Sequence, residues 1–228
     1  MLRLKTLKIK NVNLDSSILI DEIKVSYEIF GQEISKKPLV LIIHPLTGNS
    51  SVCGENGWWK QIVKNNGSID TKKYSILAFN IPGNGYDGIL YDNYSIFNTG
   101  DIAKIFFKAL EKLGIKNLHA AIGGSIGAAI CWELAALYPN LIKHLISVAG
   151  DWKATDWMIA NSSLQSRILN NSSNPIQDAR MHAMLCYRTP KSFRIRFNRS
   201  FNKEKNIFNV ESWLFHHGQK LEDRFELK

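Results

Sequence analysis

The first 150 residues alternate between segments with strand-like and helix-like hydrophobic spacing. Apolar residues at every second position, bounded by turn residues, are typical of half-buried strands. The continuous apolar run at residues 38–43 instead predicts a central strand buried on both faces of a parallel sheet. The predicted strands cover residues 4–10, 18–30, 38–43, 74–80, 117–122 and 141–149.

Helical spacing separates the later strands. Residues 101–114 and 126–138 repeat apolar side chains every three to four positions, and Gly114 is a candidate C-cap of the first of these helices. Strands that alternate with helices favour a mainly parallel sheet with helices on both faces. Residues 1–150 are therefore predicted to form an α/β core.

The pattern changes in residues 151–228, where no further β-branched runs are bounded by turns. Helical spacing there predicts helices over residues 156–169, 175–187 and 190–199, joined by turns rich in Asn and Ser. We predict that this segment is a helical cap.

The composition excludes several classes of protein. Of 228 residues, 45% are hydrophobic and 21% charged, which is unlike a disordered chain, a collagen-like fibre or a coiled coil. The longest strongly apolar run, residues 39–43, is far shorter than the ~20 residues of a membrane helix. The N-terminus lacks the apolar segment of a signal peptide, and the three cysteines lack metal-ligand spacing. We therefore expect a cytoplasmic protein without a membrane partner or a bound metal.

The net charge is +9, and basic residues are concentrated near residues 188–205. Such a cluster could meet the phosphates of nucleic acid or of coenzyme A, or could be a solvated helix face. No zinc-finger, RNA-binding or helix-turn-helix pattern accompanies it, so no nucleic-acid partner is expected. The basic residues are Arg188, Lys191, Arg194, Arg196, Arg199, Lys203 and Lys205.

The sharpest chemical signal is the Gly-x-Ser-x-Gly pattern of Gly123, Ser125 and Gly127, between a predicted strand and a predicted helix. This context is typical of a nucleophile elbow, in which small neighbours allow a strained turn that lifts the serine hydroxyl out of the sheet. A glycine-rich turn without chemistry is the alternative. A phosphate-binding loop would need a lysine that is missing here.

A second segment, residues 44–48, follows the apolar strand at residues 38–43. An oxyanion hole of this type combines the N–H after the nucleophile, here that of Ile126, with an N–H from this loop. Pro45 has no N–H, so Leu46 is the predicted second donor. His44 is interpreted as a residue that orients the loop.

Taken together, these segments resemble the homoserine O-acetyltransferases of methionine biosynthesis, within the α/β-hydrolase superfamily. The matching segments are residues 27–31, 44–48, 57–59, 69–74, 80–83, 123–127, 132–135, 138–139, 178–181, 210–214, 218–220 and 224–225.

The resemblance implies a ping-pong transfer without a bound cofactor. Ser125 would take acetyl from acetyl-CoA and pass it to the hydroxyl of L-homoserine, and the cap helices would form a homodimer. Gln165 stands where the family has an arginine that holds the substrate carboxylate, so Gln165 and Arg180 are the candidate substrate contacts. That departure favours, as an alternative, an esterase with the same serine. The segment 83–88 also departs from the family pattern, either as part of the pocket mouth or as a plain turn.

Triad acid and base residues follow the nucleophile in this superfamily, on loops after late strands. The resemblance implies that those last strands are missing from the chain, which alone would be inactive. A second polypeptide could supply Asp and His, or the chain could be a non-catalytic fragment. His182 or His217 as a substitute base is a further possibility, although helix positions are the simpler interpretation of both.

Aromatic residues and cysteines carry structural interpretations. The pairs Trp58–Trp59 and Trp152 with Trp157 are interpreted as core or cap anchors. Cys131 is expected to be a buried small hydrophobe, and Cys186 a structural thiol without a paired base.

Overall fold

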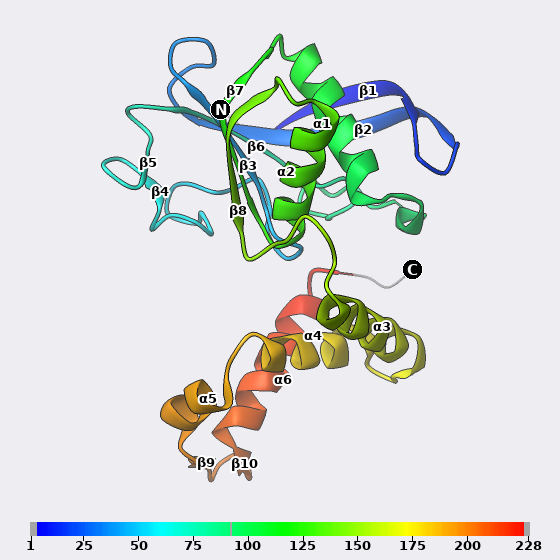
Figure 1. The fold of residues 1–228 in the computed structure, drawn as a ribbon. Coiled ribbons are helices and arrows are strands. Elements are labelled where there is room, and N and C mark those ends of the chain that lie inside the picture. The colour runs from blue at the N-terminus through cyan, green and yellow to red at the C-terminus, as the bar shows by residue number, and fades with distance from the viewer. Residues whose placement is uncertain (1–3, 92, 226–228) are drawn as a thin grey trace. The chain divides into compact units, whose positions relative to one another are not determined.

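The computed structural model describes residues 4–91 and 93–225. The chain divides into two compact units, Met1–Lys153 and Ala154–Lys228, and each is described by itself (Figure 1). The first unit contains the large sheet, and the second is mostly helical. No helix in the described residues is long and apolar enough to cross a membrane.

Six strands form the sheet of the first unit in the spatial order β1-β2-β6-β3-β7-β8. β1 pairs antiparallel with β2, and β2 antiparallel with β6. β3 runs parallel to both β6 and β7, and β8 runs parallel to β7. The predicted strands and the mainly parallel sheet are therefore confirmed. The strands are β1 (Lys5–Asn13), β2 (Leu19–Gly31), β3 (Leu39–Ile43), β6 (Ser75–Phe79), β7 (Leu118–Gly124) and β8 (Ile142–Val148).

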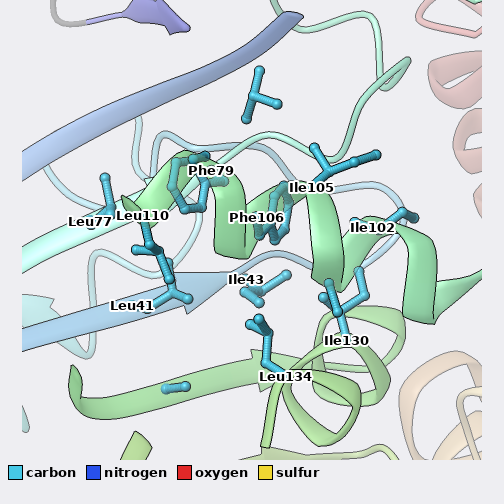
Figure 2. Close-up of a cluster of buried hydrophobic side chains, with 14 of the residues drawn as sticks. Leu41, Ile43, Leu77, Phe79, Ile102, Ile105, Phe106, Leu110, Ile130 and Leu134 are labelled. Carbon is cyan, nitrogen blue, oxygen red and sulfur yellow. The ribbon is translucent and has the colours of Figure 1, made fainter. Parts of the chain in front are cut away.

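The two α-helices described in the first unit, α1 (Thr99–Lys112) and α2 (Ile126–Leu137), cover the same face of the sheet, and a short 3-10 helix, η1 (Tyr94–Ile96), precedes α1. Alternate strand residues such as Leu41, Ile43 and Phe79 pack there against Phe106 of α1 and Ile130 of α2 (Figure 2). Side chains of a strand alternate between its two faces, so these residues define one side of the sheet. The Phe79 and Phe106 rings stack with centroids 4.9 Å apart.

The opposite face is covered differently from the prediction. Val40 and Ile42 of β3 point to that face and pack with Val52, Val63 and Ile69 of the segment between β3 and β6. This segment holds only a two-residue parallel pair, β4 (Val63–Lys64) and β5 (Ile69–Asp70). The expectation of helices on both faces was therefore wrong for the described residues. A largely irregular segment can bury a face when its own apolar side chains point inward.

The tryptophans divide into two groups. Trp58 and Trp59 lie against this second cluster with ring centroids 4.7 Å apart, which confirms them as core anchors. Trp152 and Trp157 are 72% and 70% exposed. Their interpretation as anchors was therefore wrong.

β8 lies at the edge of the sheet, and β7 is its only strand neighbour in the described residues. Ile146 and Val148 of β8 are 45% and 41% exposed. They align with Ile122 and Gly124 of β7, on the face that the helices do not cover. The apolar surface of the sheet thus continues onto an open edge.

The second unit contains the three predicted helices and a fourth that was not predicted. The predicted helices are α3 (Asp156–Asn171), α4 (Pro175–Cys186) and α5 (Pro190–Phe197). The fourth is α6 (Asn209–Glu222), which follows a two-residue antiparallel pair, β9 (Phe201–Asn202) and β10 (Ile207–Phe208). Basic side chains of the 188–205 stretch such as Arg188, Arg194 and Arg199 are exposed, as expected of a solvated face.

Gly218 explains why α6 escaped prediction. A glycine lowers helix propensity by ~1 kcal/mol relative to alanine, so it weakens the local signal. In the structure, a Cβ at this position would lie 3.2 Å from both Cβ and O of Gln177 on α4. The glycine therefore allows α6 to pack closely on α4, a tertiary reason that is invisible in the local sequence.

Replacement of Phe106 by alanine is expected to lower the free energy of unfolding by about 3–5 kcal/mol, because the side chain is fully buried between α1 and the sheet. Urea unfolding measures this loss. The matched control is Tyr94→Ala in the same unit, where the side chain is 53% exposed and a change within about 0.5 kcal/mol is expected. Equal losses in the two variants would contradict the described core.

Candidate active site

Ser125 lies between the end of β7 and the start of α2, so the predicted strand–turn–helix is confirmed. Its backbone has φ 54° and ψ −119°, a conformation that L residues rarely adopt and that costs of order 1–3 kcal/mol. The Ser125 N–H donates to the Val148 carbonyl (2.9 Å), and the Ser125 carbonyl accepts from the Ala128 N–H (2.9 Å). These bonds hold the strained residue in place while its side chain is exposed.

The two glycines of the pattern allow this turn to form. A Cβ on Gly123 would lie 2.1 Å from the Gly127 carbonyl oxygen, and a Cβ on Gly127 would lie 2.3 Å from the Ile43 carbonyl oxygen. Neither position has room for a side chain, because the first turn of α2 is pressed onto the ends of β7 and β3. Gly124 differs, because the atom nearest to a Cβ built there would be Cδ of Pro45, 3.8 Å away.

Two backbone N–H groups accompany the serine. Ile126 is the first residue of α2, and the first N–H groups of a helix have no acceptor within it. Leu46 lies in the loop after β3, its side chain 65% exposed, and its N–H has no acceptor among the described residues. This loop lies beside the elbow. A Cβ on Gly127 would lie 2.7 Å from the His44 carbonyl oxygen, and one on Gly124 would lie 3.8 Å from Cδ of Pro45. The structure thus brings Ser125, Leu46 and Ile126 together.

His44 is buried, and both ring nitrogens are engaged. Nδ1 lies 2.7 Å from the Pro45 carbonyl oxygen, which can only accept, so Nδ1 carries the proton. Nε2 accepts from the Ile81 N–H (3.0 Å) and lies 3.2 Å from Nδ2 of Asn84. His44 is therefore a neutral residue that ties the loop to the chain after β6, and the predicted orienting role is confirmed.

A buried polar network beneath this loop was missed by the sequence reasoning. Oδ1 of Asn80 accepts from the Ser50 N–H (2.7 Å) and from Nδ2 of Asn84 (3.2 Å). Nδ2 of Asn80 donates to the hydroxyls of Ser26 and Ser50 (2.9 Å each), and the Ser50 hydroxyl donates to Glu28 (2.6 Å). The one feature of the sequence that could have indicated this network was Asn80, a polar residue directly after the buried strand β6.

The 83–88 segment belongs to the same network. Asn84 is buried and contacts His44, and Asp87 accepts a hydrogen bond from the Ser26 hydroxyl. This loop is thus more than a plain turn, because it fixes the histidine that holds the loop after β3.

Gln165 and Arg180 belong to the second unit. Nε2 of Gln165, on α3, donates to the Ala179 carbonyl (3.1 Å) and lies 2.7 Å from Nδ1 of His182, both on α4. The Arg180 guanidinium lies 5.7 Å from the centre of the Tyr187 ring. Gln165 therefore joins two helices of the second unit.

The described residues contain no hydrogen bond between the Ser125 side chain and a His, Asp or Glu. His119 and His144 lie in the first halves of β7 and β8, away from the end that carries Ser125. His217 lies on α6, where burial, followed by the positive charge of Arg180, lowers its pKa. A substitute base at His182 or His217 stays a prediction. No cluster of three metal-ligating side chains occurs in the described part of the chain.

Residues 38–180 match the family described by the alpha/beta hydrolase fold. The chain belongs to this family. The match includes β3 and the elbow, which position Ser125, and it extends into α4 of the second unit.

Among curated relatives, this α/β hydrolase is 30% identical to the homoserine O-acetyltransferase of Chloroherpeton thalassium. The alignment covers 91% of the chain and 61% of that relative's length. The crystal structure of homoserine O-acetyltransferase from Staphylococcus aureus is 26% identical, with a TM-score of 0.81 over 98% of this chain and 68% of that one. A mutant of esterase E22 has a TM-score of 0.85 at 19% identity over 99% and 74% of the two chains, which shows a shared fold.

Substitution of Gly123 by alanine is expected to destabilise the protein by at least about 3 kcal/mol, because the new Cβ would overlap the Gly127 carbonyl. The matched control is Gly124→Ala, one residue along the same turn, where a Cβ would make only ordinary van der Waals contact with Pro45 and a loss below about 1 kcal/mol is expected. Thermal unfolding of both variants measures the difference. Equal stabilities would show that the elbow does not need glycine at position 123.

Proposed function

We propose that this α/β hydrolase carries out acyl transfer through Ser125. The Ser125 hydroxyl attacks the thioester carbonyl of acetyl-CoA, coenzyme A leaves as a thiol, and the acetyl group is then passed to the hydroxyl of L-homoserine. The observation that carries this proposal is the strained, exposed serine beside the backbone N–H groups of Leu46 and Ile126, for which no backbone acceptor is found in the described residues. An acyl-serine divides one difficult transfer into two easier steps.

The two N–H groups stabilise the negative charge that develops on the carbonyl oxygen during each step. Removal of a single donor of this kind from a serine enzyme costs about 10²–10³ in turnover. Both donors come from backbone that is fixed in place, one by the start of α2 and one by the His44 and Asn80 contacts. Little reorganisation is then needed as the charge forms.

In the described part of the chain, no general base is hydrogen-bonded to the Ser125 hydroxyl. A serine hydroxyl needs a group within hydrogen-bond reach that takes its proton, and a positioned base contributes about 10²–10⁴ in rate. The chain spans 61% of the Chloroherpeton thalassium relative's length. We propose that an Asp and a His from a second polypeptide or a further segment complete the site. Association of two copies through the cap helices is a separate proposal.

The identity of the molecule that accepts the acyl group depends on the residue at position 165, which is Gln165. The Gln165 amide is neutral, so it offers no cation to a substrate carboxylate, and its nitrogen already contacts the Ala179 carbonyl and Nδ1 of His182. Arg180 is the proposed carboxylate contact. This substitution also favours the second candidate function, hydrolysis of small esters, in which water replaces homoserine.

Acylation of Ser125 is the direct test. The chain is incubated with p-nitrophenyl acetate, alone and with a polypeptide equivalent to the unmatched part of the Chloroherpeton thalassium relative, and the labelled peptide is identified by mass spectrometry. The complement is expected to raise the rate of labelling at Ser125 by about 10²–10⁴. Ser125→Ala should abolish the label, whereas Ser95→Ala, at an exposed serine, should retain it. A label that persists in Ser125→Ala would refute the assignment.

The same acyl-enzyme separates the two candidate functions. Homoserine added to the complemented, acylated protein should shorten the lifetime of the acyl-serine and yield O-acetylhomoserine. A lifetime that is independent of homoserine, with acetate as the product, would instead establish an esterase.

A further inference from the structure

A cavity lies at the amino ends of three neighbouring parallel strands, β3, β7 and β8. It is bounded by the loop before β3, the loop between α1 and β7, and the loop between α2 and β8. Its volume is about 610 Å³, and small-molecule sites occupy roughly 300–1,000 Å³. Ser125 follows the other end of β7, whose seven residues at about 3.3 Å each put roughly 20 Å between the serine and the cavity. The cavity is therefore separate from the candidate active site.

Each of the three bounding segments contributes one lysine to this cavity. Lys37 precedes β3, Lys116 precedes β7, and Lys143 is the second residue of β8. No Asp or Glu is among the described residues that line the cavity. Glu33, in the loop before β3, is already paired with Lys36 (2.6 Å). The lining therefore gathers positive charge from three distant parts of the sequence without a carboxylate to neutralise it.

The three lysine amines have no partner of their own. Within residues 4–91 and 93–225, none of them forms an ion pair or a hydrogen bond. Other lysines of the same unit differ, since Lys8 pairs with Glu22 and Lys104 with Asp15. Like charges around one cavity repel each other, and an anion bound between them would replace that repulsion with attraction.

Neutral N–H groups accompany the lysines. The backbone N–H groups of Lys116 and Asn117 have no acceptor among the described residues. The side-chain amides of Asn117 and Asn140 also line the cavity, and neither forms a hydrogen bond in that part of the chain. Hydrogen bonds from such donors to an ionised oxygen are stronger than those between neutral groups. The cavity thus combines positive charge with N–H donors, which is the combination that phosphate oxygens require.

The remainder of the lining is apolar. Ile115 and Leu141 line the cavity and belong to the main buried core, against which Ile34 also packs. This apolar surface is therefore held in place by the core and does not need a ligand to form. A lone inorganic anion would leave it uncovered, whereas a molecule with a phosphate end and an apolar or aromatic body would contact both parts of the lining.

We propose that this cavity binds a phosphorylated small molecule of nucleotide size. Its phosphate groups contact the amines of Lys37, Lys116 and Lys143 and the free N–H groups of Lys116 and Asn117. Its base and sugar lie on the apolar surface. The proposal concerns binding alone and does not depend on acyl transfer through Ser125.

Binding of ADP to the chain, measured by isothermal titration calorimetry, tests this proposal. Lys37→Gln, Lys116→Gln and Lys143→Gln are each expected to weaken ADP binding about tenfold, because each removes a hydrogen bond between charged groups. The matched control is Lys10→Gln, which removes an exposed lysine from β1, at the opposite edge of the sheet. At about 0.15 M salt a remote surface charge is screened, so this control should change the affinity less than about twofold.

Pyrophosphate and adenosine carry the two halves of the ADP probe. Each is expected to bind at least about tenfold more weakly than ADP, because each fills only one part of the cavity. Circular dichroism verifies that every variant is folded.

A loss of affinity in at least two of the three lysine variants, with Lys10→Gln unchanged, supports the proposal. Undetectable ADP binding, a loss in fewer than two of the variants, an equal loss in Lys10→Gln, or pyrophosphate or adenosine binding as tight as that of ADP would overturn it.

Discussion

The geometry of the serine turn depends on one steric constraint, the absence of a side chain at Gly123 and Gly127. Contacts of 2.1 and 2.3 Å from a hypothetical Cβ show that α2 starts in direct contact with the carboxyl ends of β7 and β3. This contact sets the direction of α2, holds Ser125 at a positive φ and aligns the first N–H groups of the helix with the loop after β3. The nucleophile, one donor and the neighbouring loop are therefore consequences of a single close approach.

A second layer of polar groups makes that arrangement rigid. Asn80 uses both lone-pair directions of its oxygen and both hydrogens of its nitrogen, and His44 uses both ring nitrogens. No buried polar side-chain atom in the described residues is left without a hydrogen-bond partner. A buried network that is fully satisfied favours one conformation, since any displacement would leave a polar group unpaired. The loop that carries Leu46 is held by this network and by its contacts with the elbow.

The sequence was sufficient for the elements with strong local patterns. The central strands and α1 have uninterrupted hydrophobic spacing, and the elbow pattern required one specific backbone geometry at Ser125, which the structure contains. The predictions that were wrong or incomplete share a different cause. Each concerns a feature that is determined by contacts between segments far apart in the sequence. The helix α6 contains Gly218 for its contact with Gln177, and the second face of the sheet is covered by an irregular segment rather than a helix.

The open edge at β8 has a consequence for how the chain behaves in solution. An edge strand exposes N–H and C=O groups that can pair with any other extended backbone, and most proteins protect such edges with charge, bulges or a covering segment. β8 carries Lys143 near one end, but Ile146 and Val148 leave its other half apolar and exposed. Self-association through this strand would grow with concentration and lower the amount of monomer, so recombinant yield and colloidal stability depend on whether something caps β8.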